Sequence, residues 1–188
     1  MKQFGGDEIA RFLRAVDRHL SKRFDVVIVG GAAAALSFGA ESGTLDVDTA
    51  TSVAPIEGAF EKARKETGLE IPIGRTPVFE APYEYESRLK RLARRGLKKL
   101  RIFVPDKHDW AFMKIVRLYD KDIEDIKEVA AKIGFDKDLF LKRFIDEMTH
   151  IEPAKRLVQY FVAMMEELYG KDEADKMEAA IRKKWKIA

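Results

Sequence analysis

The chain has 188 residues, with 35 basic and 32 acidic side chains, a net charge of +3 and no cysteine. The lack of cysteine excludes disulfide-stabilised folds, thiol nucleophiles, thiolate zinc sites and iron–sulfur clusters, and a total of three histidines argues against a histidine-rich metal site. No apolar run is long enough to cross a membrane and no signal peptide is recognisable, so a cytoplasmic protein is expected, and the many Lys, Glu and Arg side chains fit a thermophilic source.

The first part of the chain, residues 1–105, is predicted to be a small mixed α/β half. Amphipathic spacing predicts a helix over 7–21, and a β-branched run over 24–29 predicts a buried strand that ends in Gly30-Gly31. Strict alternation predicts a strand over 44–50, because side chains in a strand point to opposite faces in turn. The remaining elements expected in this half are short or ordinary helices over 32–36, 56–67 and 84–95, an edge strand near 78–80, and a strand over 99–104.

The second part of the chain, residues 106–188, is predicted to be all helical and to pack on the first as a C-terminal region. Its pattern is apolar at helical spacing and is interrupted by single glycines and a proline. The fold class expected from both halves is therefore α+β. The helices are expected near 107–118, 121–133, 136–148, 153–169 and 171–186.

Two aspartates follow the glycine pair at a spacing that favours metal binding. Alternation places Asp46 and Asp48 on one face of the expected strand, where their charges repel each other unless a cation lies between them. Mg²⁺ prefers carboxylate oxygens and also binds phosphate oxygens. Gly30 and Gly31 lack a Cβ, so a triphosphate could approach their backbone and the N–H groups of the following helix.

The segments 29–32 and 45–48 resemble the mark of the nucleotidyltransferase superfamily, which is a Gly-Gly or Gly-Ser turn followed by an Asp-x-Asp strand. The resemblance implies a nucleotidyltransferase-like core in residues 1–105. It also implies that Gly30 and Gly31 hold the triphosphate of an NTP substrate, and that Asp46 and Asp48 hold Mg²⁺ or Mn²⁺.

A second pair of segments, 108–114 and 121–126, is similar to an Asp-Leu-x-x-x-Lys … Lys-Asp-x-x-Asp-Leu pattern. The pattern occurs in a branch related to the nucleotidyltransferase-like toxins of abortive-infection (type IV) toxin–antitoxin systems. There the helical lysine and a following aspartate belong to the active site, which implies Lys114 and either Asp122 or Asp125 here. On one continuous helix Lys114 and Asp125 would face the same way, because their separation makes about three turns.

The chain departs from the superfamily in its third carboxylate, which catalytic members usually carry on a later strand. The strand expected over 99–104 has a basic residue and no acid. Glu80, on the expected edge strand, is the remaining candidate for a third metal ligand. Without a third acid, a different base would have to act, or the protein would bind nucleotide without turning it over.

Each of these residues also has a structural interpretation. The glycines could form only a tight turn, and Asp46 and Asp48 could be the solvated face of an edge strand. Lys114 could be a surface lysine. Asp122 and Asp125 could be acids of a first helical turn, where the helix dipole favours negative charge.

Residues 88–101 hold eight basic residues and no acidic one, so the rest of the chain is net acidic. One interpretation of this segment, Arg88 to Arg101, is a solvated helix face. The other is an RNA interface, in which each Lys or Arg releases counterions from the phosphates. Leucines rather than aromatic residues separate the basic ones, so stacking of bases is not indicated.

The first functional hypothesis is a magnesium-dependent nucleotidyltransferase that moves a nucleoside monophosphate from NTP to an acceptor hydroxyl of RNA, a protein or a small molecule, in a toxin-like manner or otherwise. In it, Lys114 contacts phosphate, and Asp122 or Asp125 positions the lysine or the acceptor. The alternative is a non-catalytic protein of the same fold that binds nucleotide or a cognate partner protein. Neither hypothesis involves a membrane.

Overall fold

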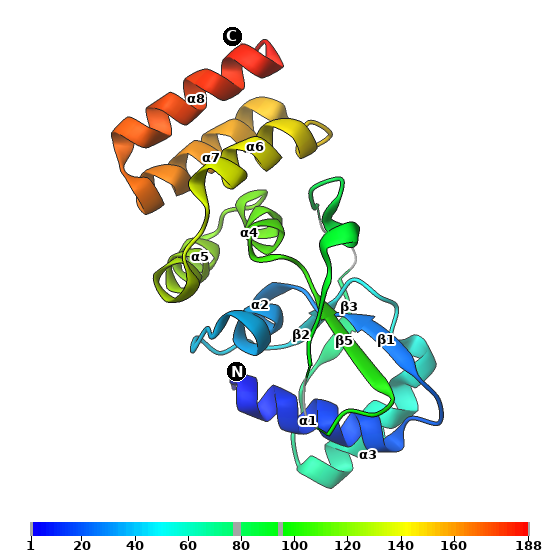
Figure 1. Cartoon of the computed structure of the whole chain (residues 1–188). Coiled ribbons are helices and arrows are strands. Elements are labelled where there is room, and N and C mark those ends of the chain that lie inside the picture. Colours follow the sequence, from blue (N-terminus) through cyan, green and yellow to red (C-terminus); the bar gives the residue numbers. More distant parts are fainter. Residues whose placement is uncertain (1, 77–79, 94–95, 188) are drawn as a thin grey trace. The chain divides into compact units, whose positions relative to one another are not determined.

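Strands occur only before residue 105 in the computed structural model, which describes residues 2–76, 80–93 and 96–187 (Figure 1). The described residues form two compact units, and the sheets belong to the first. The second unit consists mainly of helices, so the expected α+β class with a helical C-terminal part is confirmed. The first unit comprises residues 2–76, 88–93 and 96–106, and the second comprises residues 80–87 and 107–187.

The first unit contains two small sheets. One has the strand order β1-β5-β4, in which β1 and β5 are parallel and β4 and β5 antiparallel; the other pairs β2 and β3 in parallel. An isolated bridge between Ile28 and Thr49 joins the two sheets. The elements are α1 (Gly6–His19), β1 (Phe24–Val27), α2 (Gly30–Ala33), a π-helical turn (Ala34–Phe38), β2 (Val47–Thr49), a 3₁₀ turn (Ala54–Ile56), α3 (Glu57–Thr67), β3 (Ile73–Arg75), β4 (Lys90–Arg91) and β5 (Leu100–Val104). A second 3₁₀ turn (Tyr85–Arg88) belongs to the second unit except for its last residue.

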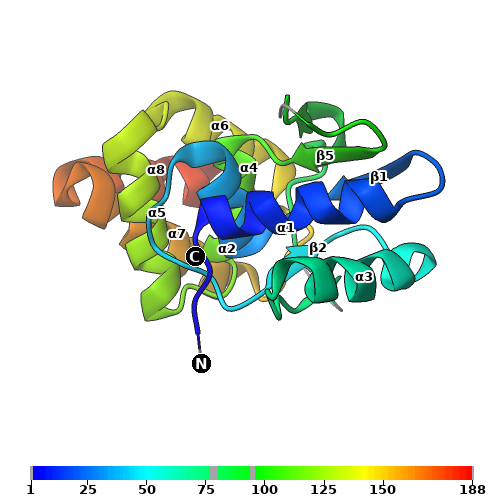
Figure 2. The ribbon, with the colours of Figure 1, turned by 90° about the horizontal axis from the view of Figure 1, so that it is seen from below.

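The apolar stripe of α1 forms the core of the first unit together with α3 and β5. Figure 2 shows α1 and α3 side by side, and the rings of Phe12 and Phe60 lie 6.4 Å apart between them. Side chains alternate along β5, so that Leu100, Ile102 and Val104 are buried while their neighbours are half-buried. The helical period of 3.6 residues in α1 and the strand period of two residues in β5 therefore each place apolar side chains on one face, and both faces line the same core.

A buried carboxylate on α1 fixes the beginning of β5. The Oδ1 atom of Asp17 accepts three backbone N–H groups, from Lys98 at 3.0 Å, Lys99 at 2.7 Å and Leu100 at 2.6 Å. Burial opposes the ionisation of this carboxyl, but the three donors outweigh it, so the pKa of Asp17 lies below its ordinary value of 3.8. One side chain thereby satisfies three backbone donors that no strand pairs at this point.

The second unit is held together by aromatic rings. The ring of Phe144 stacks on Phe161 with centroids 4.0 Å apart and on Trp185 at 5.1 Å, while Phe112 meets Phe140 edge to face at 5.1 Å. Of the helices that the structure describes, none is long and apolar enough to cross a membrane. The helices are α4 (Lys107–Ile115), α5 (Asp120–Ile133), α6 (Lys137–Glu147), α7 (Ala154–Tyr169) and α8 (Lys171–Trp185).

Three expectations from the sequence need correction or restriction. The helix predicted over 84–95 is wrong over residues 84–93, because the backbone there forms a 3₁₀ turn and then β4, whose neighbour Leu92 donates its N–H to the Ile102 carbonyl at 2.9 Å. Residues 94 and 95 lie outside the described residues. Pairing with β5 thus overrides the local helix propensity of this segment. The strand predicted over 44–50 is shorter, since only Val47–Thr49 is paired. Of the edge strand predicted near 78–80, residues 78 and 79 lie outside the described residues, and Glu80 is in no strand.

Replacement of Asp17 tests the role of its three bonds. Asp17→Ala is expected to lower the free energy of unfolding by about 3 kcal/mol, because buried N–H groups lose their acceptor. Urea unfolding measures the loss, and Asp7→Ala, at an exposed position in the first turn of α1, is the control with an expected loss below about 1 kcal/mol. Equal losses in both variants would contradict this role of Asp17.

Candidate functional site

The carboxylate of Asp48 lies directly against the backbone of Gly30. A Cβ added at Gly30 would stand 3.1 Å from Asp48 Oδ2, and the φ angle of Gly30 is +62°, in the left-handed region. The neighbouring backbone fixes this approach, since Val29 donates its N–H to the Asp48 carbonyl at 2.9 Å. The strand β2 therefore brings a carboxylate to the first turn of α2, and only glycine fits there without strain.

Gly31 is similarly close to Thr44, which lies two residues before Asp46. A Cβ on Gly31 would lie 2.9 Å from the Oγ1 atom of Thr44, closer than real Cβ atoms come. Thr44 is itself held by an isolated bridge to Phe4. Sequence reasoning did not single out Thr44, although its position two residues before Asp46 on an alternating segment was a usable signal.

The two aspartates differ in their surroundings. Asp48 lies on β2 and is half-buried, whereas Asp46 is exposed in the bend before the strand. Within the ranges that the structure describes, no three His, Asp or Glu side chains converge as a metal site. Mg²⁺ often takes only one or two carboxylates and completes its shell with phosphate oxygens and water, so a pair of this kind fits the ion when a substrate phosphate is present.

The neighbouring strand does not supply a third carboxylate. In the β2–β3 pair, Gly74 is the partner of Asp48 and Arg75 is the partner of Thr49. Glu80, the third acid considered from the sequence, belongs to the second unit and lies outside the strands. The Asp48 carboxylate therefore has Gly74 beside it on the next strand, whereas Arg75 shares the opposite face with Thr49.

The second motif forms a buried ionic cluster in the second unit. The Nζ atom of Lys114 donates to Asp122 Oδ1 at 2.9 Å and to Asp125 Oδ2 at 2.7 Å, and the three residues are only 3, 1 and 4 % exposed. The interpretation of Lys114 as a surface lysine is thus wrong. The sequence left open whether Asp122 or Asp125 accompanies the lysine, and the structure brings both to it.

Two further cations complete the cluster, and sequence reasoning missed both. Arg117 donates through Nε to Asp122 Oδ2 at 2.9 Å, and Lys121 lies 2.7 Å from Asp125 Oδ1, one helical turn away. Asp122 also accepts the backbone N–H of Tyr119 at 3.2 Å and so helps to begin α5. The i,i+4 spacing of Lys121 and Asp125 was the available signal in the sequence.

Burial disfavours the charged form of Asp125, yet its pKa lies below the ordinary value of 3.8. Hydrogen bonds from Lys114 and Lys121, together with the positive charges of these two residues, outweigh the burial. The same bonds hold the Lys114 side chain at the centre of the cluster. The cluster is not one continuous helix, because α4 ends at Ile115 and α5 begins at Asp120.

His108 and Asp109, at the start of the second motif, have structural partners. The Nε2 atom of His108 accepts the backbone N–H of Asp136 at 3.0 Å, where α6 begins. Asp109 is fully buried and lies 3.1 Å from Arg143 Nη1. These two contacts connect α4 with α6.

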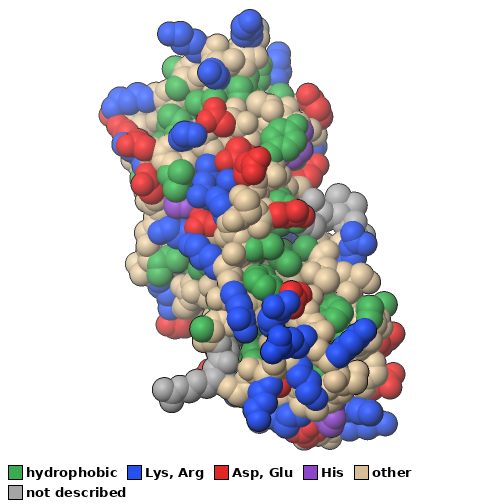
Figure 3. All heavy atoms as spheres, turned by 45° about the vertical axis from the view of Figure 1, so that its right-hand side comes forward, with side chains coloured by type: hydrophobic (Ala, Val, Ile, Leu, Met, Phe, Trp, Pro, Cys, Tyr) green, Lys and Arg blue, Asp and Glu red, His purple; other side chains and the backbone are tan. Residues whose placement is uncertain are grey.

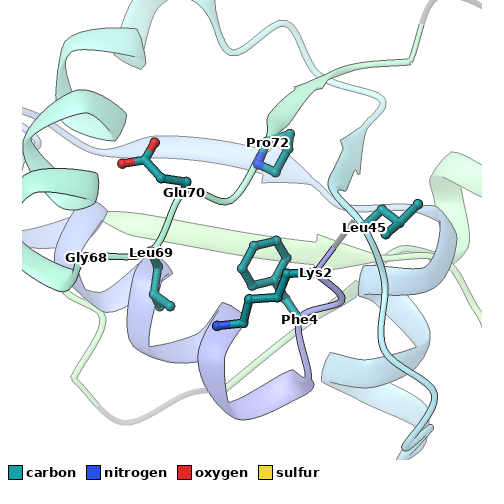
Figure 4. A pocket seen from close by; sticks show the side chains of 7 residues that line it. All are labelled: Lys2, Phe4, Leu45, Gly68, Leu69, Glu70 and Pro72. Carbon is teal, nitrogen blue, oxygen red and sulfur yellow. The ribbon is translucent and has the colours of Figure 1, made fainter.

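A hollow of about 340 Å³ in the first unit lies near the aspartate pair but does not include it. The rings and chains of Phe4, Leu69 and Pro72 make it apolar, and Figure 4 shows Leu45 and Glu70 at opposite ends. A second hollow of about 280 Å³ is lined by residues of α3 and β3, among them Arg64 and Arg75. Neither contains Gly30, Gly31, Asp46 or Asp48, so the candidate site is defined by its close backbone contact and not by these hollows.

A comparison of two glycine variants separates the destabilisation caused by the close Gly30–Asp48 contact from the free-energy cost of the left-handed backbone at Gly30. Gly30→Ala is expected to destabilise more than Gly68→Ala, because both glycines have left-handed φ angles of +62° and +66° but only Gly30 has a side chain within 4 Å. The shared cost is about 1–2 kcal/mol and the excess at Gly30 about 1 kcal/mol. Urea unfolding measures both, and an equal loss would contradict a tight Gly30–Asp48 contact.

The Asp125 carboxylate is expected to make the free energy of unfolding depend on pH in the acidic range. Its folded pKa is lowered, so its contribution is complete above the ordinary value of 3.8 and is lost as the pH falls through the lower folded value. Asp125→Asn is expected to cost about 2 kcal/mol at neutral pH, and this difference should shrink as the pH falls below 3.8 and vanish only below the lowered folded pKa. Unfolding free energies across this range check the trend, with the exposed Asp175→Asn on α8 as the control. A pH-independent difference between Asp125→Asn and the unmodified protein would contradict the assignment.

Among the comparisons with known proteins, the match to a family model covers both motifs. No curated protein and no solved structure matches the chain. A family model described as a nucleotidyltransferase of unknown function (DUF6036) matches residues 8–171, which include the glycine pair, the two aspartates of the first motif and the buried cluster of the second. The match spans most of the chain and confirms the resemblance to the nucleotidyltransferase superfamily. The chain therefore belongs to this family of nucleotidyltransferases.

Proposed function

We propose that the protein is a magnesium-dependent enzyme that transfers a nucleoside monophosphate from a nucleoside triphosphate to an acceptor hydroxyl. The observation that carries the proposal is the contact between the Asp48 carboxylate and Gly30 at the start of α2. It brings a hard anionic ligand next to a helix beginning whose backbone N–H groups favour phosphate. Membership of a nucleotidyltransferase family supports the general type of reaction.

The first unit supplies the nucleotide site in this proposal. In it, the triphosphate meets the backbone N–H groups at Gly30 and Gly31, next to the Asp48 carboxylate. Asp46 and Asp48 hold the metal ion, which when bound would neutralise the charge that develops on the phosphate oxygens. Catalysis by such a site rests on positioning and electrostatics, which the fixed contact at Gly30 favours.

Lys114 keeps in this proposal the role of a phosphate contact that the resemblance implies. An ammonium group has three N–H donors, and two of them are directed at Asp122 and Asp125. The two carboxylates act as positioning residues that fix the ammonium group. Glu80 is left out of the proposal, because it is in no strand.

Removal of the aspartate pair tests the transfer reaction. Asp46→Ala with Asp48→Ala is expected to reduce label transfer from a radiolabelled nucleoside triphosphate at least about a hundredfold, since the metal loses both ligands. The control is Asp7→Ala with Glu61→Ala, which removes the same charge from exposed positions on α1 and α3. Equal transfer by the two double variants would end the proposal.

One observation favours the alternative of a non-catalytic nucleotide-binding or partner-binding protein. The strand beside Asp48 carries Gly74 and Arg75, where an acid would be expected in a catalytic member. Calorimetry separates the two functions before any acceptor is known. Triphosphate binding that requires Mg²⁺ and is lost in the aspartate double variant supports the enzyme, whereas failure to bind any nucleotide supports the partner-binding protein.

A toxin-like role is the finer form of the enzyme proposal, in which the transferred group inactivates the acceptor.

A further inference from the structure

Basic side chains gather on the hairpin that β4 and β5 form in the first unit. Lys90 and Arg91 make up the short edge strand β4, and both are exposed. Lys98, in the loop before β5, is exposed as well. Arg91 is the register partner of Phe103, so it lies over the face of the sheet that is turned away from the buried side chains of β5.

The helix α1 adds a second row of cations next to this hairpin. Arg11, Arg14 and Arg18 recur at three- and four-residue spacing, so they share one stripe of the helix. A Cβ placed on Gly96 would lie 3.3 Å from Cδ of Arg14, which puts the stripe beside the hairpin loop. Figure 3 shows Lys and Arg side chains gathered in the lower part of the view, with few acidic side chains among them.

Some cations near this surface are already engaged. Arg18 pairs with Glu66, Lys90 with Asp106 and Arg101 with Asp25. Glu8, the acid closest in sequence to Arg11, pairs with Lys2 at 2.9 Å. Lys99 directs its Nζ at the Leu20 carbonyl. The four cations left on α1 and the hairpin make no ion pair with any residue in the described part of the chain: Arg11, Arg14, Arg91 and Lys98.

We propose that these four side chains bind the phosphodiester backbone of a nucleic acid and, resting on the proposed function, that the bound RNA is the acceptor of the transfer. Cations on a helix and a neighbouring hairpin that make no ion pair within the described chain can contact the phosphates of a nucleic acid. The sequence placed the basic contact on residues 88–101 alone. The structure extends the surface to α1, which that segment does not include.

The chemistry of this surface favours a nucleic acid over a membrane. A peripheral membrane surface needs apolar side chains that enter the lipid beside the cations. The large hydrophobic side chains exposed among the described residues are Leu45, Tyr83, Tyr119 and Ile133, and none of them belongs to α1, β4 or β5. The surface is therefore suited to phosphates that remain in water.

Salt dependence of binding tests the surface. The 188-residue chain, without triphosphate or metal, is titrated by fluorescence anisotropy into a short duplex RNA and a duplex DNA of the same sequence. Four phosphate contacts predict that the affinity falls about a hundredfold between about 50 and 200 mM salt. Replacing Arg11, Arg14, Arg91 and Lys98 by Gln is expected to reduce the slope of log K against log salt by about three to four.

The matched control removes the same charge elsewhere. Lys62, Lys65, Lys183 and Lys184 are exposed on α3 and α8, and their replacement by Gln should leave the salt slope almost unchanged. A wild-type slope in the first quadruple variant, an equal loss in the control, or binding to anionic phosphatidylserine vesicles but to neither duplex would overturn the proposed surface.

Separate measurements of label transfer and of nucleic-acid binding distinguish a failure of this inference from a failure of the proposed function. Label transfer onto RNA but not onto DNA of the same sequence supports RNA as the acceptor, and transfer onto neither nucleic acid while a small hydroxyl compound is labelled would overturn it. Salt-dependent binding without transfer to any acceptor would overturn the proposed function and leave the binding surface in place. Transfer without binding would overturn the surface alone.

Discussion

The backbone at Gly30 and Gly31 approaches β2 and the residues before it so closely that no side chain fits between them. Asp48 and Thr44 occupy the space that a Cβ would need at the two glycines. The end of β1, the beginning of α2 and the strand β2 are thereby fixed relative to one another, and the backbone bond from Val29 to Asp48 has the same effect. Any chemistry that uses the Asp48 carboxylate depends on this contact, because the contact fixes the position of the negative charge relative to the first turn of α2.

The sequence was informative where one local signal and the tertiary structure agreed. The glycine pair, the β-branched run before it and the Asp-x-Asp spacing predicted the strand–turn–helix arrangement, and the structure adds a reason for glycine that the sequence alone did not contain: the close approach of Asp48 and Thr44. The helices of the second unit were predicted to within a few residues, because their apolar periodicity and glycine endings are strong.

Other features depend on residues far apart in the chain. The segment before β5 has good helix formers, yet it pairs with β5 as β4, because the tertiary partner satisfies its backbone. Asp17 bonds three N–H groups about eighty residues away, and no local pattern indicates such a contact. Lys114 was assigned by resemblance, but its two carboxylate partners follow from the break between α4 and α5, whose geometry no periodicity predicts.

The strand β4 has one further consequence. It is only two residues long, it lies at the outer edge of its sheet, and both of its side chains are cations. An open sheet edge offers unpaired backbone groups on which strands of other molecules can assemble, and short charged edges discourage that assembly. The positive charge that suits this surface to phosphates therefore also protects the folded protein from aggregation with its own copies.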